Sequence, residues 1–346
     1  MKSFYTFILL VLCSTLATNA QKVVALHSDA NGVQYFDGTS ALQDAYTAAV
    51  ATDTIYLTGG TFIPPALFDK QLTIFGAGHH PNATTATQAT IISTHVTLGD
   101  NADGFYLEGV VINGNLNLGD ANDISVNDIV IKRCRLGTLI AGGTSETNTS
   151  NNNLFVENII FSTSVSNLRS STFYNNIFQN RNYNFTDLLF VNNVFNYQSF
   201  SSNHWTIENY ANNCVFRNNI FLNESAYVSE GNGQSEWINN IFCSPSTNTN
   251  LGLDPILTNN YHMSRAEVLV DQSGDNFNYA HDYHLQPGAA ANLGDDGTET
   301  GIYGGVYPWK DFSIPTNPHI VSKAISGSSD ASGNIQVNIT VEAQDN

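Results

Sequence analysis

Six charged residues lie close together near the middle of the chain. The basic ones are Lys132, Arg133 and Arg135, and the acidic ones are Asp120, Asp123 and Asp128. A basic side chain beside a substrate can remove a proton or neutralise an anion, and several carboxylates together can hold a cation. The three basic residues are therefore candidate catalytic residues, and the three aspartates are a candidate metal site. The alternative is a solvated face on which these charges only balance one another.

Aromatic side chains form a second set of candidates. Tyr174, Trp205 and Tyr210 could stack on a sugar ring or contact a protein partner, because an aromatic ring offers a large, rigid apolar face. The alternative for each is packing in the core. That alternative is favoured for Trp237, which occupies a position of the repeat that is always large and apolar.

The histidines and the overall charge argue against a zinc site and against a nucleic-acid partner. The pairs His79-His80 and His281-x-x-His284 lack the third and fourth ligands that a zinc site needs, so we expect no zinc there. The chain has 30 acidic and 12 basic residues among 346, which gives a formal charge of −18. Such a chain has no basic footprint for nucleic acid. With 42% hydrophobic and 12% charged residues, it is expected to fold rather than remain disordered.

A six-residue unit that recurs every 17 to 26 residues must position these side chains. A period of this length is typical of solenoids, and units rich in Phe, Ile, Val and Asn favour strands over helices. The sequence therefore predicts one β-coil for each repeat. The units are 107–112, 131–136, 155–160, 173–178, 190–195, 216–221 and 237–242.

The columns of the repeat predict which side chains face inward. The first and sixth positions are large and apolar, and the fourth accepts Val, Cys or Asn but no charge, so all three should point into the coil. Stacked inward amides can hydrogen-bond along the coil axis. The second and third positions vary and are expected to face water, which would place Lys132, Arg133 and Asn218 outside. The predicted ladder consists of Asn158, Asn176, Asn193, Asn219 and Asn240.

These repeats, and the opening of the chain, resemble the right-handed parallel β-helix of the pectate-lyase-like superfamily. The opening contains the apolar helical face of residues 40–49, the strand-like 53–57, Gly59-Gly-Thr-Phe62 and Lys70 to Gly78. The resemblance covers about residues 22 to 310. It implies an all-β solenoid whose first coil is capped by an amphipathic helix with Ser40 as its N-cap.

The resemblance also implies one enzymatic alternative. Enzymes of this superfamily that cleave uronic-acid polymers by β-elimination use a Lys or Arg as base and often Ca²⁺ to neutralise the uronate. Lys132, Arg133 and Arg135 would supply the base, and Asp120, Asp123 and Asp128 would bind Ca²⁺. The strongly negative charge opposes an anionic polymer. It therefore favours a non-catalytic module that binds a glycan or a partner in the cell envelope, and the lyase is the alternative.

The ends of the chain predict its organisation. Residues 1–20 have a basic start, an apolar stretch and small residues before a cut after Ala20, which indicates a cleaved signal peptide and a secreted or cell-surface protein without a transmembrane segment. The solenoid is expected over residues 21–310. A closing tail over 311–346 contains a β-hairpin formed by His319 to Ile325 and Asn334 to Glu342. Cys134, Cys214 and Cys243 are expected to be free, buried thiols.

Overall fold

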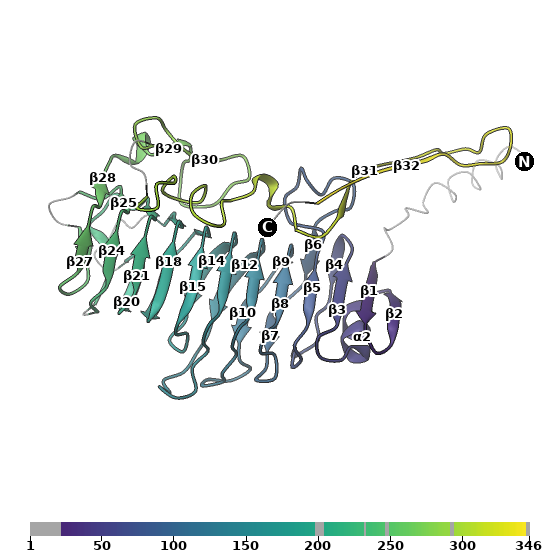
Figure 1. Ribbon diagram of the computed structural model, residues 1–346, viewed down its shortest axis with the longest axis horizontal. Helices are drawn as coiled ribbons and strands as arrows, with labels where there is room; N and C mark the ends of the chain where they lie inside the picture. Colours follow the sequence, from purple (N-terminus) through teal and green to yellow (C-terminus); the bar gives the residue numbers. More distant parts are fainter. Residues whose placement is uncertain (1–21, 198–203, 232, 246–248, 291–293, 344–346) are drawn as a thin grey trace, which may run out of the picture.

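The protein is a right-handed parallel β-solenoid with short strands in every coil (Figure 1). The computed structural model describes residues 22–343 except 198–203, 232, 246–248 and 291–293. The predicted signal peptide, residues 1–20, therefore lies outside the described residues. The all-β solenoid predicted from the repeats is confirmed.

The coils build three faces. One face is a 12-stranded sheet, and the other two are joined into a 16-stranded sheet because β12 and β14 run through the corner between them. The 12-stranded sheet contains, in order, β2 (Gly32–Asp37), β1 (Val23–Ser28), β3 (Thr54–Leu57), β5 (Thr73–Phe75), β8 (Tyr106–Glu108), β11 (Val130–Lys132), β13 (Leu154–Val156), β15 (Ser171–Tyr174), β18 (Leu188–Val191), β21 (Val215–Arg217), β24 (Glu236–Ile238) and β27 (Ile256–Thr258). The second face contains β4 (Gly60–Phe62), β6 (Thr90–Ile92), β9 (Val111–Ile112), β12 (Arg135–Ile140), β14 (Ile159–Ser164), β16 (Ile177–Phe178), β19 (Val194–Phe195), β22 (Ile220–Phe221), β25 (Ile241–Phe242) and β28 (Tyr261–His262). The third face contains β7 (Val96–Leu98), β10 (Leu116–Leu118), the second halves of β12 and β14, β17 (Asn182–Thr186), β20 (Ile207–Asn212), β23 (Tyr227–Ser229) and β26 (Asn250–Leu251).

Helix α2 (Ala41–Ala48) covers the first coil, as predicted. Ala41, Leu42 and Ala45 form its buried face. Ser40 precedes the helix, but its hydroxyl donates to the Asp44 carboxylate at 2.8 Å rather than capping a backbone amide. At the other end the Lys70 ammonium donates to the carbonyl oxygens of Tyr46 and Ala49, both at 2.8 Å, which satisfies acceptors that a helix C-terminus leaves free.

The asparagine ladder is confirmed. In each step the side-chain oxygen of one asparagine accepts hydrogen bonds from both the backbone amide and the side-chain amide of the asparagine one coil earlier, at 2.8–3.1 Å. Each side-chain amide also donates to a carbonyl of the preceding coil, as Asn219 does to Phe190 at 2.9 Å. Asn260 continues the ladder beyond Asn240. The sequence prediction missed it because its unit ends in His262 rather than in a large apolar residue.

The residue before each ladder position has a left-handed backbone. Its φ ranges from 49° at Arg133 to 74° at Gly109, and Asn175, Asn192 and Asn218 lie between these values. Asparagine and glycine tolerate this conformation best among the amino acids, which explains the frequent Asn-Asn pairs of the repeat. The third position is therefore the turn between the first and second faces.

Two stacks of aromatic rings fill the coils. The first-position stack passes through Phe155, Phe173, Phe190, Phe216 and Trp237, with ring centroids 4.1–4.9 Å apart. The sixth-position stack contains Phe178, Phe195, Phe221, Phe242 and His262, at 4.5–5.5 Å. Trp237 is fully buried, so its assignment to the core is confirmed.

The solenoid strands end earlier than the sequence suggested. The last parallel strand among the described residues is β28. Residues 263–290 and 294–318, here named the return segment, instead run back along the outside of the coils towards the N-terminal end (Figure 1). The return segment contains the short 3-10 helices η1 (Arg265–Glu267) and η2 (Asp311–Ser313), and the antiparallel pair β29 (Leu269–Asp271) and β30 (Asp282–Leu285). Its apolar residues, including Leu269, Tyr283 and Ile302, pack on Ile177, Val194, Ile220 and Ile241.

The return segment is joined to the third-position column by hydrogen bonds. Working towards the N-terminus, Asn218 bonds Asp295, Asn192 bonds Glu299 and Gly301, Asn175 bonds Ile302 and Gly304, Glu157 bonds Lys310, and Arg133 bonds Ile314. These side chains do leave the coil, but they are buried beneath the return segment. The prediction that Arg133 and Asn218 face water is therefore wrong.

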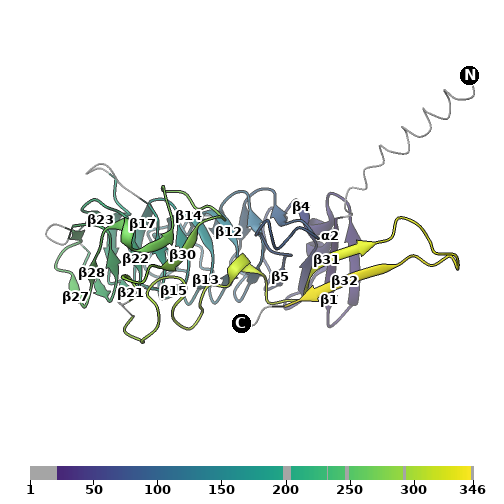
Figure 2. The same cartoon turned by 90° about the horizontal axis from the view of Figure 1, so that it is seen from above.

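The predicted C-terminal hairpin is present as β31 (His319–Ile325) and β32 (Val337–Glu342). It leaves the solenoid at the N-terminal end and projects beyond the first coil (Figure 2). The sequence had suggested that such a tail would cover the last coil. It lies at the opposite end because the return segment first crosses the whole solenoid.

The three thiols are free and buried, as predicted. Burial raises the pKa of each thiol to about 12, so the thiolate is nearly absent at neutral pH. We expect Cys134, Cys214 and Cys243 to react with 5,5′-dithiobis(2-nitrobenzoic acid) only after denaturation. Release of thionitrobenzoate from the native protein within minutes would contradict this placement.

Candidate functional site

The structure separates the members of the predicted basic cluster. Arg133 is fully buried between two carboxylates: its Nε lies 3.1 Å from Glu157, its Nη1 lies 3.6 Å from Glu108, and Nη1 also donates to the Ile314 carbonyl at 2.8 Å. Lys132 is buried beside it, and burial together with the charge of Arg133 lowers its pKa. Neither side chain can reach a polymer outside the protein. Arg135 is exposed, and its guanidinium lies 5.7 Å from the ring centroid of Tyr279.

The three predicted metal ligands do not converge. Asp120 and Asp128 are exposed, and one oxygen of Asp123 accepts hydrogen bonds from the amides of Thr144 and Ser145, each at 2.7 Å. In the part of the chain that the structure describes, no group of three or more His, Cys, Asp or Glu side chains could hold a metal ion.

Of the three predicted ligand-binding aromatics, Tyr174 lies on a different face from Trp205 and Tyr210. Tyr174 is half-buried in β15 of the 12-stranded sheet, and its ring lies 5.3 Å from Tyr307 of the return segment. Trp205 precedes β20 and packs edge-on against Tyr227 at 5.1 Å, while Tyr210 lies within β20. The structure therefore does not bring these three rings together into one site.

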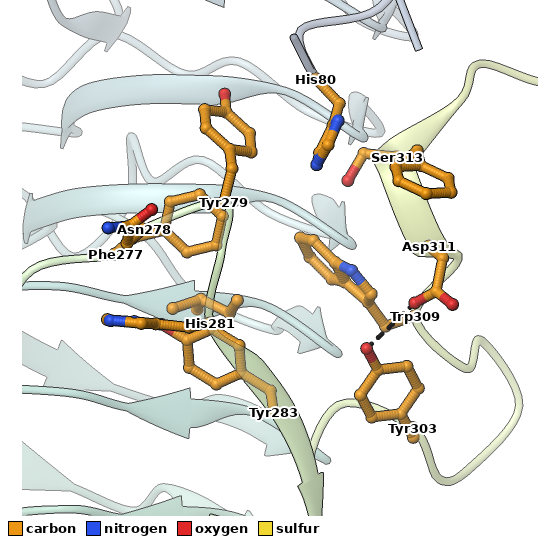
Figure 3. Close-up of a pocket in the computed structure, with 12 residues that line it drawn as sticks. His80, Phe277, Asn278, Tyr279, His281, Tyr283, Tyr303, Trp309, Asp311 and Ser313 are labelled. Carbon is orange, nitrogen blue, oxygen red and sulfur yellow. Dashed lines mark hydrogen bonds between the residues drawn. The ribbon is translucent and has the colours of Figure 1, made fainter. Parts of the chain in front are cut away.

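A different set of aromatic rings forms a cavity between the solenoid and the return segment (Figure 3). The cavity has a volume of about 120 Å³. His80 comes from the loop after Gly78, Ile177 comes from β16, and the return segment supplies the other residues. The aromatic rings that line it are Phe277, Tyr279, Tyr283, Tyr303, Trp309 and Phe312. We name this cavity the aromatic pocket.

Contacts between rings hold the aromatic pocket in shape. His80 packs edge-on against both Tyr279 and Phe312, with ring centroids 4.8 Å apart in each case. Phe277 packs edge-on against Tyr279 at 4.9 Å. The Tyr279 hydroxyl also donates to the carbonyl of His79 at 3.2 Å, which joins the return segment to the loop after Gly78. The pocket walls are therefore fixed by contacts between parts of the chain 200 residues apart.

Polar side chains also belong to the wall of this cavity. The Tyr283 hydroxyl and Nδ1 of His281 are buried and have no hydrogen-bond partner among the described residues. The Tyr303 hydroxyl donates to the Asp311 carboxylate at 3.1 Å, as the dashed line in Figure 3 shows. Burial lowers the pKa of His80, and the Asp311 carboxylate acts in the opposite direction. The pocket thus combines ring faces with hydrogen-bonding groups and one carboxylate.

A second depression shares Phe277 with the aromatic pocket. It is lined by Val111, Arg135 and Gln179 of the solenoid and by Asn276 and Phe277 of the return segment, and its volume is about 450 Å³. Phe161, also in its wall, is 44% exposed. Arg135 is thus the one member of the predicted basic cluster that lies beside the pocket.

Sequence reasoning missed this site for an identifiable reason. The solenoid was expected to continue to residue 310, which would place His281, Tyr283 and His284 in a final coil, whereas these residues lie in and just before β30 of the return segment. The density of aromatics between Phe277 and Phe312 was a usable signal, because these residues fall outside the repeat and so are not needed to fill a coil.

Two further findings bear on function. In the parts of the chain that the structure covers, none of the helices has both the length and the apolar character needed to span a bilayer. No protein-family model matches the chain, and the comparisons with curated proteins and with solved structures give no significant match either.

Proposed function

We propose that this protein is a secreted or cell-surface member of the pectate-lyase-like superfamily that binds a neutral glycan without cleaving it. The signal-peptide pattern supports the secreted or cell-surface location, and the solenoid supports the superfamily. The observation that carries the proposal of glycan binding is the aromatic pocket, whose lining joins ring faces to buried polar groups without hydrogen-bond partners among the described residues. A second depression of about 450 Å³ shares Phe277 with this pocket and offers space for a further sugar ring.

The chemistry of the pocket fits a pyranose better than an apolar ligand. The face of a sugar ring that carries only C–H groups packs on aromatic rings such as Trp309, while its hydroxyl groups need hydrogen-bond partners such as the Tyr283 hydroxyl and His281. A formal charge of −18, with Asp311 at the pocket, opposes uronic-acid polymers. A neutral glycan is therefore the favoured ligand.

The lyase alternative has less support. A β-eliminating enzyme needs its base in contact with the sugar, yet Lys132 and Arg133 lie beneath the return segment. Of the three predicted bases, Arg135 alone is exposed, and its guanidinium lies beside Tyr279 of the aromatic pocket. Incubating the protein with uronic polysaccharides, with and without Ca²⁺, and measuring absorbance from unsaturated ends tests this alternative. We expect no such product.

Trp309→Ala should weaken glycan binding at least about tenfold, or about 1.4 kcal/mol, because truncation of an aromatic anchor removes its contact area. The measurement is affinity electrophoresis or calorimetry against a panel of neutral and uronic polysaccharides. The matched variant is Trp205→Ala, which removes a half-buried tryptophan outside the pocket and should leave affinity unchanged.

The pair of tryptophan variants separates two possible sites. If Trp205→Ala weakens binding and Trp309→Ala does not, the ligand occupies the surface around Trp205 and Tyr210, and the aromatic pocket is not the site. If no polysaccharide in the panel binds the wild-type protein, the proposal of glycan binding fails.

A further inference from the structure

The wall of the aromatic pocket includes a strained turn. Phe312 has a φ of 67° and a ψ of 0°, and Ser313 beside it has a φ of 46°. In the part of the chain that the structure describes, these are the only two adjacent non-glycine residues that both have a left-handed backbone. This conformation is uncommon for residues other than glycine, and it is an outlier for a side chain as bulky as phenylalanine. The turn therefore stores strain that a relaxed backbone would release.

Buried carboxylates hold both ends of this turn. The backbone amide of Lys310 donates to Glu157 at 3.1 Å. The amide and the hydroxyl of Thr316 donate to the two oxygens of Glu108, at 2.9 and 2.7 Å. Both glutamates are at most 1% exposed. A strained backbone persists only where its surroundings fix it, and these two anchors fix the turn between Lys310 and Thr316.

The middle of the turn is held less firmly than its ends. The Phe312 ring packs edge-on against His80 at 4.8 Å, but Phe312 is 47% exposed, so moving it away uncovers little additional apolar surface. Inside the turn, the Ser313 amide donates to the carbonyl of Lys310 at 2.9 Å. Relaxing Phe312 and Ser313 to negative φ undoes this 3-10 turn and its hydrogen bond, while the two anchors need not change.

The aromatic pocket is small for the ligand proposed above. Its volume of about 120 Å³ lies below the range of about 300–1,000 Å³ that small-molecule sites occupy. Trp309, Asp311 and Ser313, all in or next to the turn, belong to its lining (Figure 3). Because this wall already stores strain, the release of that strain offsets part of the cost of displacing it. The turn is therefore the part of the wall best placed to move when a ligand enters.

We propose that residues 310–316 form a gate on the aromatic pocket. In the closed state, which this structure shows, Phe312 and Ser313 are left-handed and the Phe312 ring packs on His80. In the open state both residues relax to negative φ between the fixed anchors, and a sugar ring enters. The inference rests on the proposed glycan function for what enters, but the opening itself is measured without a ligand.

Hydrogen exchange resolved to single amides tests the opening in the ligand-free protein, because the exchange of a buried amide reports how often its hydrogen bond opens. After correction for intrinsic rates, the Ser313 amide should exchange at least about tenfold faster than the anchored amides of Lys310 and Thr316. It should also exchange faster than the ladder amide of Asn193, which is released on global unfolding. Equal rates for all four amides would mean that the turn opens only when the whole protein unfolds, which would overturn the proposal.

Two variants at one position separate strain from side-chain chemistry. Ser313→Gly removes the strain of a left-handed residue, whereas Ser313→Ala removes the same hydroxyl and keeps the strain. The glycine variant should favour the closed state, so its amide at position 313 should exchange about tenfold more slowly than that of the alanine variant. Equal rates in the two variants would contradict the role of strain. If a substitution at the buried Ser313 prevents folding, Phe312→Gly and Phe312→Ala repeat the comparison.

Binding measurements connect the gate with the glycan site. If a ligand enters only the open state, its apparent affinity falls by the same factor as the open fraction. Cellohexaose, xylohexaose and mannohexaose serve as neutral probes in calorimetry. A probe that binds the wild type should bind Ser313→Gly about tenfold more weakly than Ser313→Ala. Equal affinities despite different exchange rates would overturn the gate. If neither these probes nor any polysaccharide of the panel binds, the proposed glycan function fails, and the exchange rates still decide whether the turn opens.

Discussion

Replacing Arg133 with alanine should lower the free energy of unfolding by about 3–5 kcal/mol, because it leaves Glu108 and Glu157 buried without their common cation. The Ile314 carbonyl also loses a donor. Alanine retains Cβ, so the left-handed backbone at this position, with φ of 49°, costs much the same in both proteins. Urea unfolding followed by circular dichroism measures the change.

The matched control is Arg135→Ala, two residues along the chain, where the side chain is exposed. An ion pair of an exposed charge contributes at most about 1 kcal/mol to stability. The urea midpoint of this variant should therefore be close to that of the wild type. Limited proteolysis adds an independent measurement: Arg133→Ala should expose the return segment around Ile314 to cleavage. Equal midpoints for the two arginine variants would show that the buried ion pairs do not hold the return segment.

Asn219→Leu should lower the free energy of unfolding by about 2–6 kcal/mol. The substitution leaves about two buried backbone groups unpaired, and each unpaired group costs roughly 1–3 kcal/mol. These groups are the amide N–H of Asn193, which donates to Asn219 at 2.8 Å, and the carbonyl of Phe190, which accepts from it at 2.9 Å. Leucine has a similar volume and fits the apolar interior, so the loss measures the hydrogen bonds rather than a cavity. Urea unfolding again gives the value.

A comparison within the same coil checks the ladder. Asn212→Leu changes an exposed asparagine at the end of β20. Its free energy of unfolding should stay within about 0.5 kcal/mol of the wild-type value, as is usual for surface substitutions. Asn218→Leu is not a mild control, because Asn218 is buried against Asp295 and has a left-handed φ of 58°. A ladder variant that unfolds at the same urea concentration as Asn212→Leu would contradict the ladder's contribution to stability.

The repeat made the solenoid predictable. Each inward column repeats the same kind of side chain, so seven units together identified the Phe stack, the asparagine ladder and the place of Trp237. The capping helix was predictable for a related reason, since Ala41, Leu42 and Ala45 fall on one face at helical spacing. The C-terminal hairpin followed from alternation within its own strands.

The return segment and the sites that it forms could not be predicted in this way. Its partners are distant in sequence: Thr316 bonds Glu108 and Ile314 bonds Arg133, and neither pair recurs as a pattern. The third column accepts Gly, Arg, Glu and Asn, which indicated a solvent-facing turn. The column does leave the coil, but what covers it is a chain segment rather than water, and single residues cannot distinguish these two surroundings.

The return segment also limits how this solenoid can change in length. Other solenoids gain or lose repeats readily because each repeat contacts only its neighbours. Here one added coil would lengthen the stack by about 4.8 Å, and a segment that spans it would need one or two more residues at about 3.3 Å each. Without these extra residues, the hydrogen bonds that residues 295–316 make to the third-position column on one side of the inserted coil would lose their partners. The number of coils and the length of the return segment therefore have to change together, which predicts that natural variation in this protein adds residues to loops rather than whole coils.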